Sequence, residues 1–494
     1  MPPPPSVAAA QRRAVAALLA FAPVVTDLAR RFTDAGFELS LVGGPVRDAL
    51  LGRLERGGAR GQSPAADLDL TTDARPDRTV ELLRGWADTH WEIGREFGTI
   101  GARRGADVIE VTTYRTDRYS PQSRKPEVQF GDSLQGDLSR RDFTVNAMAV
   151  RLPELSFVDP FGGLADLAAR RLRTPVTATQ SFDDDPLRML RAARFSSQLG
   201  FDVAPDVVAA MTDLASRIAI VSPERVQAEL VKLLLSPAPR RGLELLVDTG
   251  VCELVLPELP ALRLEIDEHH RHKDVYQHSL TVLEQAMDLE TGPDGPVPAP
   301  DLVLRLAALL HDIGKPATRR FEKAGGVSFH HHEVVGAKLA ARRLRELRFD
   351  KATVSAVARL TELHLRFHGY GGGEWTDSAV RRYVTDAGPL LERLHRLTRA
   401  DSTTRNQRKA ARLAASYDDL ERRIAVLAEA EELAAVRPDL DGAAIMSLLG
   451  IPPGPLVGRA YRHLLALRME HGPLARDAAE AALLQWWAEQ PEHP

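Results

Sequence analysis

The spacing of apolar and polar positions divides the chain into two parts of different character. Between residues 37 and 172, short runs alternate apolar and polar positions at a period of two and stop at glycines, which is typical of strands and turns. After residue 174, long segments rich in Ala, Leu, Glu and Arg indicate helices. Residues 1–36 also have a helical pattern. The sequence therefore predicts an α+β unit followed by an all-helical remainder.

Three segments of the first part have the alternation of a strand. Residues 37–42 alternate at period two and end at a pair of glycines, so we expect a strand followed by a sharp turn. The next alternating run, from residue 67 to 71, puts Asp67 and Asp69 on one face and leucines on the other. Residues 107–113 form the third predicted strand.

Composition narrows the class of protein. The chain has 494 residues with 44% apolar positions, which predicts a sizeable core and two to four domains. No run approaches the ~20 apolar residues of a membrane span, and the start lacks the pattern of a signal peptide. The single cysteine, Cys252, excludes an internal disulfide framework and a cysteine-rich zinc site. We expect a cytoplasmic protein with no membrane partner. The net charge of −4 does not by itself indicate nucleic-acid binding.

The carboxylate pair is the first candidate for chemistry. Side by side on a strand, Asp67 and Asp69 can share Mg²⁺ ions, which prefer oxygen ligands. An isolated pair of this kind is often only a solvated strand end. Here it follows the Gly43-Gly44 turn, where backbone amides can approach phosphate, and Arg47 can add a bidentate phosphate contact. The alternative is an ordinary strand-to-helix turn with solvated charges. It is less favoured because the glycine turn and the carboxylate pair occur together.

Four motifs, in family order between about residues 40 and 230, resemble those of the class II tRNA nucleotidyltransferase and bacterial poly(A) polymerase family. They are Gly43-Gly44-x-x-Arg47-Asp48 with Asp67-Leu68-Asp69, then Arg140-Arg141-Asp142-Phe143-Thr144-Val145-Asn146-Ala147, then Asp184-Asp185-Pro186-Leu187-Arg188-Met189-Leu190-Arg191-Ala192-Ala193-Arg194-Phe195, and Pro223-Glu224-Arg225-Val226-x-x-Glu229. Two departures are a longer segment from Leu54 to Ala66, interpreted as a loop insertion, and Asp184 where the family often has Glu.

The resemblance implies an N-terminal nucleotidyltransferase sheet domain of the polymerase-beta-like kind, followed by a helical neck. Its implied catalytic residues are Asp67 and Asp69 with Mg²⁺, and Glu110 is a candidate third carboxylate. The implied nucleotide-binding residues are Gly43, Gly44, Arg47, Asp48, Arg141, Asp142, Asn146, Asp185, Arg188, Arg191 and Arg194.

Base selection without a template requires side chains that read the incoming base. Spaced by three on a predicted helix, Asp185, Arg188 and Arg191 share a face. A carboxylate accepts from the exocyclic amine of C and A, whereas G and U leave buried groups unpaired. The position of Asp185 before a proline also suits a helix N-cap, and it can serve both roles. Residues 114–136 resemble the flexible loop of complete CCA-adding enzymes, which favours full CCA addition over CC addition.

A second set of residues lies downstream and resembles the HD phosphohydrolase superfamily. In chain order its members are His278, His311, Asp312, His332, His364 and Asp401. A lone buried histidine is usually structural, but six positions in family order are poorly explained that way. Mixed imidazole and carboxylate ligands suit a divalent metal, whose identity stays open. Such a site can activate water for phosphoester hydrolysis.

Together these features predict five segments: a helical lead-in (1–36), the nucleotidyltransferase head (37–173), a helical neck with the base-selecting motif (174–262), an HD domain (263–402) and a helical tail (403–494). The expected function is template-independent addition or repair of the CCA end of tRNA from CTP and ATP, with release of pyrophosphate. A poly(A) polymerase, an HD phosphohydrolase with a tRNA-binding head, and a regulatory nucleotidyltransferase are the alternatives. The net acidic charge argues against a poly(A) polymerase. The intact carboxylate pair argues against a head that only binds tRNA, and the base-selecting motif argues against a regulatory nucleotidyltransferase.

Overall fold

The computed structural model describes residues 7–21, 23–54, 67–120, 123–131, 133–264, 275–321, 327–367, 370, 375–402, 406–431 and 437–490. Most of the predicted insertion, residues 55–66, lies outside these ranges. The chain forms two compact units, Met1–Pro257 and Glu258–Pro494, and each is described by itself.

The first unit is built on a seven-stranded mixed sheet with the order β3-β4-β5-β2-β1-β8-β9. Only β2 and β5 are parallel neighbours; the other pairs are antiparallel. The strands are β1 (Leu39–Val42), β2 (Asp67–Thr72), β3 (Thr89–Trp91), β4 (Thr99–Arg104), β5 (Asp107–Thr113), β8 (Ala149–Leu152) and β9 (Ser156–Val158). All three strands expected from the alternation are present, although β1 begins two residues later than predicted.

Alternation along the strands decides which side chains enter the core. Leu68 and Leu70 of β2 are fully buried with Leu41 and Ile109 of the neighbouring strands. Because successive residues of a strand face opposite sides, Asp69 lies on the other face of the sheet. The helices around this core are α1 (Val7–Phe21), α2 (Val24–Asp34), α3 (Gly44–Leu50) and α4 (Pro76–Leu83), together with the 3-10 turn η1 (Arg95–Phe97).

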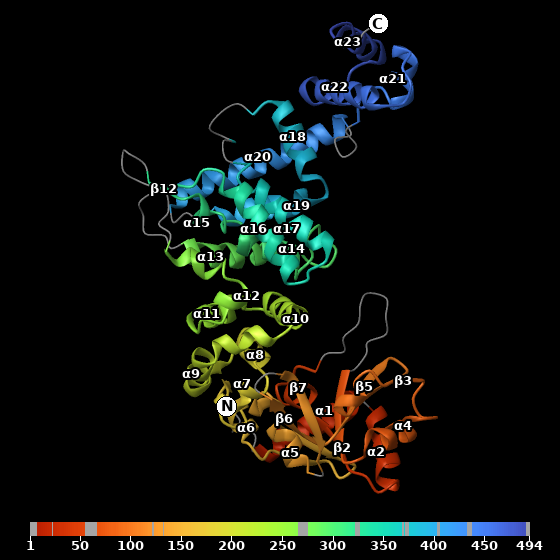
Figure 1. Ribbon diagram of the computed structural model, residues 1–494, viewed down its shortest axis with the longest axis vertical. Helices are drawn as coiled ribbons and strands as arrows, with labels where there is room; N and C mark the ends of the chain where they lie inside the picture. The colour runs from red at the N-terminus through yellow and green to blue at the C-terminus, as the bar shows by residue number, and fades with distance from the viewer. Residues whose placement is uncertain are drawn as a thin grey trace. The chain divides into compact units, whose positions relative to one another are not determined.

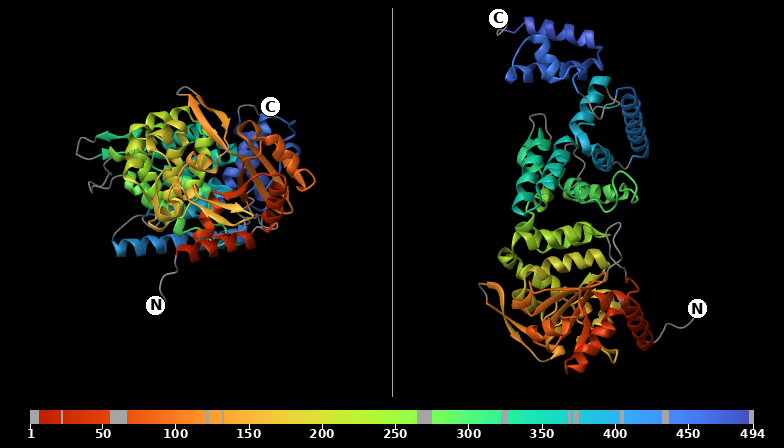
Figure 2. Two further views of the ribbon diagram at one scale, coloured as in Figure 1. Left: turned by 90° about the horizontal axis from the view of Figure 1, so that it is seen from below. Right: turned by 90° about the vertical axis from the view of Figure 1, so that its right-hand side faces the viewer.

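The segment expected to be a flexible loop contains a separate two-stranded hairpin, β6 (Arg115–Ser120) and β7 (Ser123–Phe130). After strands β8 and β9 the chain becomes mainly helical from about residue 174, as predicted, and α8 packs against α10 and α11 within the same unit (Figures 1 and 2). The elements are α5 (Leu134–Ser139), η2 (Thr144–Asn146), α6 (Gly163–Ala168), β10 (Arg171–Leu172), α7 (Ala178–Asp184), α8 (Leu187–Leu199), β11 (Asp202–Val203), α9 (Pro205–Asp213), η3 (Ala215–Ile220), α10 (Pro223–Leu234), α11 (Pro239–Asp248) and α12 (Cys252–Val255).

In its described residues the second unit is helical apart from one short hairpin and an isolated β-bridge, so the expected α+β fold followed by helices is confirmed. Its elements are η4 (Pro260–Leu264), α13 (Val275–Asp288), α14 (Leu302–Leu310), α15 (Lys315–Thr318), β12 (Arg320–Phe321), β13 (Val327–Ser328), α16 (His332–Glu346), α17 (Lys351–Leu363), α18 (Asp377–Ala387), η5 (Gly388–Leu390), α19 (Leu391–Asp401), α20 (Gln407–Glu431), α21 (Gly442–Leu449), α22 (Pro455–His471) and α23 (Arg476–Ala488). Within the described residues, every helix is too short or too polar to cross a membrane.

Candidate functional site

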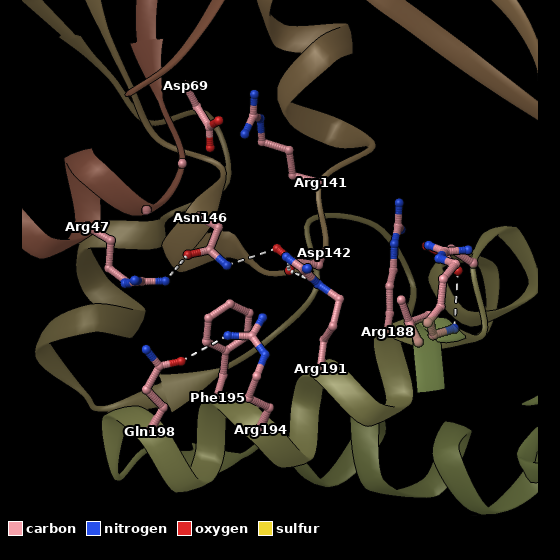
Figure 3. A pocket seen from close by; sticks show the side chains of 15 residues that line it. Arg47, Asp69, Arg141, Asp142, Asn146, Arg188, Arg191, Arg194, Phe195 and Gln198 are labelled. Carbon is pink, nitrogen blue, oxygen red and sulfur yellow. Dashed lines mark hydrogen bonds and ion pairs between the residues drawn. The ribbon is translucent and has the colours of Figure 1, made fainter. Parts of the chain in front are cut away.

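A cavity of about 380 Å³ opens in the first unit, between the glycine turn, strand β2 and helix α8. This volume lies in the range of small-molecule sites. The residues that line it are Gly43, Gly44, Arg47, Asp69, Arg141, Asp142, Asn146, Asp185, Leu187, Arg188, Arg191, Arg194, Phe195, Gln198 and Arg225 (Figure 3). Side chains from segments more than a hundred residues apart therefore meet in one polar cavity.

Gly43 allows two charged groups to approach the backbone. Its φ is +77°, a conformation that residues with a side chain rarely adopt. A Cβ atom there would stand 3.1 Å from Nη1 of Arg141 and 3.3 Å from Oδ2 of Asp69. The absence of a side chain at Gly43 thus leaves room for a cation and a carboxylate side by side.

The carboxylates expected to hold a metal lie on neighbouring strands. Asp69 pairs in register with Glu110, because β2 and β5 run parallel. Residues in register on adjacent strands point to the same face of a sheet, so Glu110 is next to Asp69 although it does not line the cavity. Asp67 begins β2, two residues before Asp69, and its side chain lies outside the described part of the chain. An oxygen-rich pair at this edge fits a divalent cation.

A line of hydrogen bonds crosses the floor of the cavity. Nη1 of Arg47 donates to Oδ1 of Asn146 (2.7 Å), and Nδ2 of Asn146 donates to Oδ1 of Asp142 (3.0 Å). Arg191 donates through Nε to the other oxygen of Asp142 at 2.7 Å (Figure 3). Burial raises the pKa of Asp142, but Arg191 and Asn146 outweigh it and hold that pKa well below the usual range. Asp48 binds Arg47 at 2.8 Å and does not line the cavity.

Three arginines of helix α8, namely Arg188, Arg191 and Arg194, line the cavity, and each forms hydrogen bonds with other side chains. Arg188 donates to Oγ of Ser181 at 2.8 Å. Nε of Arg194 donates to Glu229 at 2.5 Å. Asp185 precedes the helix and does not sit on its face as the spacing predicted, because α8 begins only at Leu187. Its Oδ1 accepts from the backbone N–H of that residue at 3.2 Å, which is a capping contact.

Arg141 is held by a carboxylate that the sequence did not single out. Asp137 is fully buried and accepts from Arg140 (2.6 Å), Arg141 (3.4 Å) and Oγ1 of Thr71 (3.1 Å). Burial raises the pKa of Asp137, but the two arginines outweigh it and lower that pKa below its ordinary value. Since Thr71 lies on β2 two residues after Asp69, Asp137 ties Arg141 to the strand of the carboxylate pair.

Four further residues line the cavity without having been predicted: Leu187, Phe195, Gln198 and Arg225. The guanidinium carbon of Arg194 lies 3.8 Å from the centroid of the Phe195 ring, and Nη1 of Arg194 donates to Gln198 at 2.9 Å. Gln198 follows Arg194 by one helical turn, and this spacing is the signal that could have revealed it.

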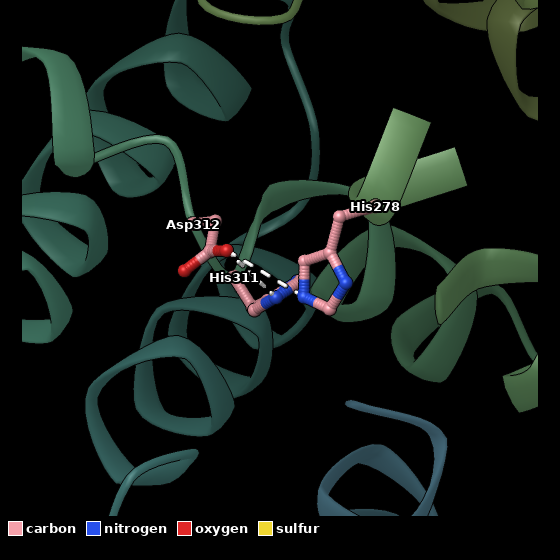
Figure 4. Close-up of side chains that lie close together, drawn as sticks. All are labelled: His278, His311 and Asp312. Atoms are coloured by element: carbon pink, nitrogen blue, oxygen red, sulfur yellow. Dashed lines mark ion pairs between the residues drawn. The ribbon is translucent and has the colours of Figure 1, made fainter. Parts of the chain in front are cut away.

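The second unit brings all six predicted histidines and aspartates together. Asp312 lies at the centre, and its two oxygens face different histidines. Oδ2 is 3.3 Å from Nε2 of His311 and 3.7 Å from that of His278 (Figure 4). On the other side, Oδ1 is 3.3 Å from Nε2 of His332 and 3.9 Å from that of His364. The sixth member, Asp401, contacts Nε2 of His278 at 2.9 Å.

The backbone determines which nitrogen each histidine offers. Nδ1 of His311, His332 and His364 lies 2.6–2.8 Å from the carbonyl oxygen three residues earlier. Because a carbonyl only accepts, Nδ1 carries a proton, and Nε2 is the nitrogen that faces the cluster and can take up either a proton or a metal ion. Within the described residues, none of these three buried Nε2 atoms makes a hydrogen bond. Oδ2 of Asp312 forms an ion pair with Nζ of Lys315 at 2.8 Å. Buried acceptors directed at a common point are the arrangement of a metal site.

Charge at this cluster also favours a cation. Burial by itself lowers the pKa of His311, but the carboxylates of Asp312 and Asp401 raise it to about 10. The pKa of His364 is lowered to about 3, first by burial and then by the neighbouring His311. The carboxylates therefore attract a positive charge, and the donor set fits a divalent metal ion.

Comparison with known proteins identifies the kind of domain that contains each site. Residues 39–173 match the family described as Poly A polymerase head domain, residues 200–262 the one described as Probable RNA and SrmB- binding site of polymerase A, and residues 275–406 the HD domain. An A-adding tRNA nucleotidyltransferase of Deinococcus radiodurans is 36% identical over 431 residues, which is 83% of this chain and 94% of that enzyme. A CCA-adding enzyme of Streptococcus gordonii is 40% identical over 235 residues, 47% of this chain and 55% of that enzyme.

The fold has a solved counterpart as well. The crystal structure of the Bacillus stearothermophilus CCA-adding enzyme in complex with CTP is similar with a TM-score of 0.65 and 24% identity, over 94% of this chain and 97% of that one. Fold and sites define a nucleotidyltransferase head joined to an HD domain. The chain belongs to the class II tRNA nucleotidyltransferase and poly(A) polymerase family, which confirms the resemblance found in its motifs.

Proposed function

We propose that this chain completes or repairs the CCA end of tRNA without a template, consuming CTP and ATP and releasing pyrophosphate. One observation carries the proposal: a single cavity is lined both by Asp69, a residue of the carboxylate pair, and by Asp185 and Arg188 of the base-selecting motif. A nucleotide bound there has its triphosphate near the carboxylates and its base near α8. The five-segment division predicted from the sequence is part of this proposal.

Each side chain has a role in this arrangement. Asp67 and Asp69 hold Mg²⁺, and Glu110 supports them from the adjacent strand. When bound, Mg²⁺ neutralises the triphosphate and lowers the pKa of the attacking 3′-hydroxyl. Arg141, beside Asp69, binds phosphate oxygens. Arg47 makes its contacts within the protein, so its function is to orient Asn146 and the groups beyond it rather than to bind phosphate.

The side chains that recognise the incoming base are Asp185, Arg188 and Arg191, at and just before helix α8. Asp185 accepts from the exocyclic amine of C or A, and Arg188 and Arg191 donate to ring nitrogen and carbonyl groups. Asp142 fixes the orientation of Arg191. Holding these donors in place before the nucleotide arrives reduces the entropic cost of the transfer.

The decisive experiment is incubation with tRNA that lacks its last three nucleotides, together with CTP and ATP. Addition of C, C and A followed by arrest supports the proposal. A ladder of A residues indicates a poly(A) polymerase. Extension only of tRNA that already ends in CC indicates an A-adding enzyme, the activity named for the Deinococcus relative. No extension of either tRNA contradicts the proposal.

A second function is favoured by the buried acceptors around Asp312. We propose that the HD domain binds a divalent metal through His278, His311, Asp312, His332, His364 and Asp401, and hydrolyses phosphoesters. The test is hydrolysis of a 2′,3′-cyclic nucleotide and of a phosphomonoester with Mg²⁺, Mn²⁺, Co²⁺ or Ni²⁺ added. Lack of hydrolysis with every metal contradicts this second proposal and leaves the first untouched.

A further inference from the structure

Helix α10 presents two charged side chains to α8, one helical turn apart. Arg225 lies in its first turn and Glu229 four residues later, so both project from the same face. Glu229 is the partner of Arg194 and also approaches Nη1 of Arg191 at 3.7 Å. Nη2 of Arg225 donates to Oδ2 of Asp185 at 3.0 Å. Helix α10 thus supplies counter-ions to the side chains of the base-selecting motif.

Asp185 is held at both of its oxygens. Oδ1 accepts from the backbone N–H of Leu187, and Oδ2 accepts from Arg225. Each carboxylate oxygen has two lone-pair directions, so a further donor can bind while both contacts persist. The side chains of Asp185 and Arg225 are 22% and 42% exposed and line the cavity, so a ligand in the cavity can reach this pair.

We propose that Arg225 is a specificity-determining residue, which orients the Asp185 carboxylate so that it accepts a hydrogen bond from the exocyclic amine of the incoming base. An ionised carboxylate only accepts, so the amines of C and A satisfy it. The corresponding carbonyl oxygens of U and G are acceptors and leave it unpaired. The inference rests on the proposed function, which supplies the nucleotide.

A purely structural role for Arg225 is disfavoured on two grounds. A basic residue in the first turn lies at the positive end of the helix dipole, where it does not stabilise the helix. An ion pair as exposed as that of Arg225 and Asp185 contributes little to folding stability. Its position in the cavity wall is better explained by a contact that matters when a nucleotide binds.

The experiment measures base selectivity in Arg225→Ala and Arg225→Lys, with Lys232→Ala as a control on an exposed position of the same helix. The quantities are the ratios of kcat/KM for CTP over UTP and for ATP over GTP, on tRNA substrates awaiting each base. We expect Arg225→Ala to lower these ratios by about tenfold, which is within the range expected when one hydrogen bond at the site is weakened, and to raise KM for the correct nucleotide more than it lowers kcat. Arg225→Lys should recover part of the selectivity, and Lys232→Ala should match the wild type.

The inference is overturned if Arg225→Ala loses activity to the same extent with all four nucleotides, since a structural residue acts without regard to the base. If circular dichroism shows that Arg225→Ala is unfolded, the same ratios measured on Arg225→Met, which keeps the length of the side chain and removes the donor to Asp185, decide; wild-type selectivity there overturns the inference. A wild-type protein that extends no tRNA contradicts the proposed function instead. The two failures are therefore distinguishable.

Discussion

Gly43 is the position at which one added methyl group disturbs both the backbone turn and two charged groups of the cavity. In Gly43→Ala the new Cβ stands 3.1 Å from Nη1 of Arg141 and 3.3 Å from Oδ2 of Asp69. Both distances are shorter than ordinary contacts of a Cβ atom, so both groups must shift by a few tenths of an ångström. The positive φ of +77° adds strain of about 1–3 kcal/mol.

The expected result is a loss of activity larger than the loss of stability explains. Displacing reacting groups by about 1 Å costs on the order of 100-fold in rate, so a shift of a few tenths of an ångström predicts a loss of roughly fivefold. Gly388→Ala is the matched control, because Gly388 (φ 52°, ψ −130°) has a backbone conformation close to that of Gly43 (φ 77°, ψ −139°) and no atom within 4 Å of an added Cβ. It carries a similar backbone strain without the crowding.

The assay is single-turnover incorporation of CTP and ATP into tRNA lacking its CCA end, with thermal unfolding of both variants measured in parallel. We expect similar melting temperatures for the two variants and a much slower reaction only for Gly43→Ala. If Gly43→Ala is as active as Gly388→Ala, the glycine is required for the turn alone, and the idea that it makes room for Asp69 and Arg141 is wrong.

Three further predictions follow from the same contacts. Asp69→Asn should abolish nucleotide incorporation with an unchanged circular dichroism spectrum, because it removes a charge from the metal edge. Asp137→Asn should destabilise the protein by about 3–5 kcal/mol at neutral pH, since it leaves two arginines without their buried carboxylate. The folded-state pKa of Asp137 is depressed, so its contribution to stability is fully present above the unfolded-state pKa of about 3.9. That contribution is lost as the pH falls through the folded-state pKa. Urea unfolding between pH 7 and pH 3 should therefore show that the difference in unfolding free energy between wild type and variant narrows only below about pH 4. Asp312→Asn should reduce the divalent metal bound per chain, measured by mass spectrometry of the metal, and should abolish phosphoester hydrolysis while nucleotide incorporation continues.

Each of these has an outcome that contradicts it. If Asp69→Asn still incorporates nucleotides, the proposal that Asp69 holds a catalytic Mg²⁺ ion is wrong. A stability gap for Asp137→Asn that stays constant down to pH 3, or widens there, would falsify the assignment of a depressed pKa. Unchanged metal content in Asp312→Asn means that the metal is bound elsewhere.

The candidate site could be predicted only in part, and the particular residues show where prediction stopped. The strand alternation and the motif located Asp69 and Arg141, and both line the cavity. Spacing put Asp185 on the face of a helix, which is wrong because the helix begins two residues later, whereas its position before a proline correctly indicated the capping contact. Asp48 shares its motif with Arg47 but turns to that arginine instead of the cavity. Local sequence patterns indicate which charged residues of an element are exposed. They do not indicate which hydrogen-bond or ion-pair partner each of these residues contacts.

What the sequence determined by itself is the order of the elements, the carboxylate pair, and the six histidines and aspartates of the HD domain. These follow from local periodicity and from the composition of short motifs, which do not depend on how distant parts of the chain pack together. Only the tertiary structure decided that Arg225 binds Asp185, 40 positions away, that Arg47 reaches Asn146 across 99, and that His278 meets Asp401 across 123. Buried charged groups require partners, and the partner is whichever group the packing of sheet and helices brings within hydrogen-bonding distance.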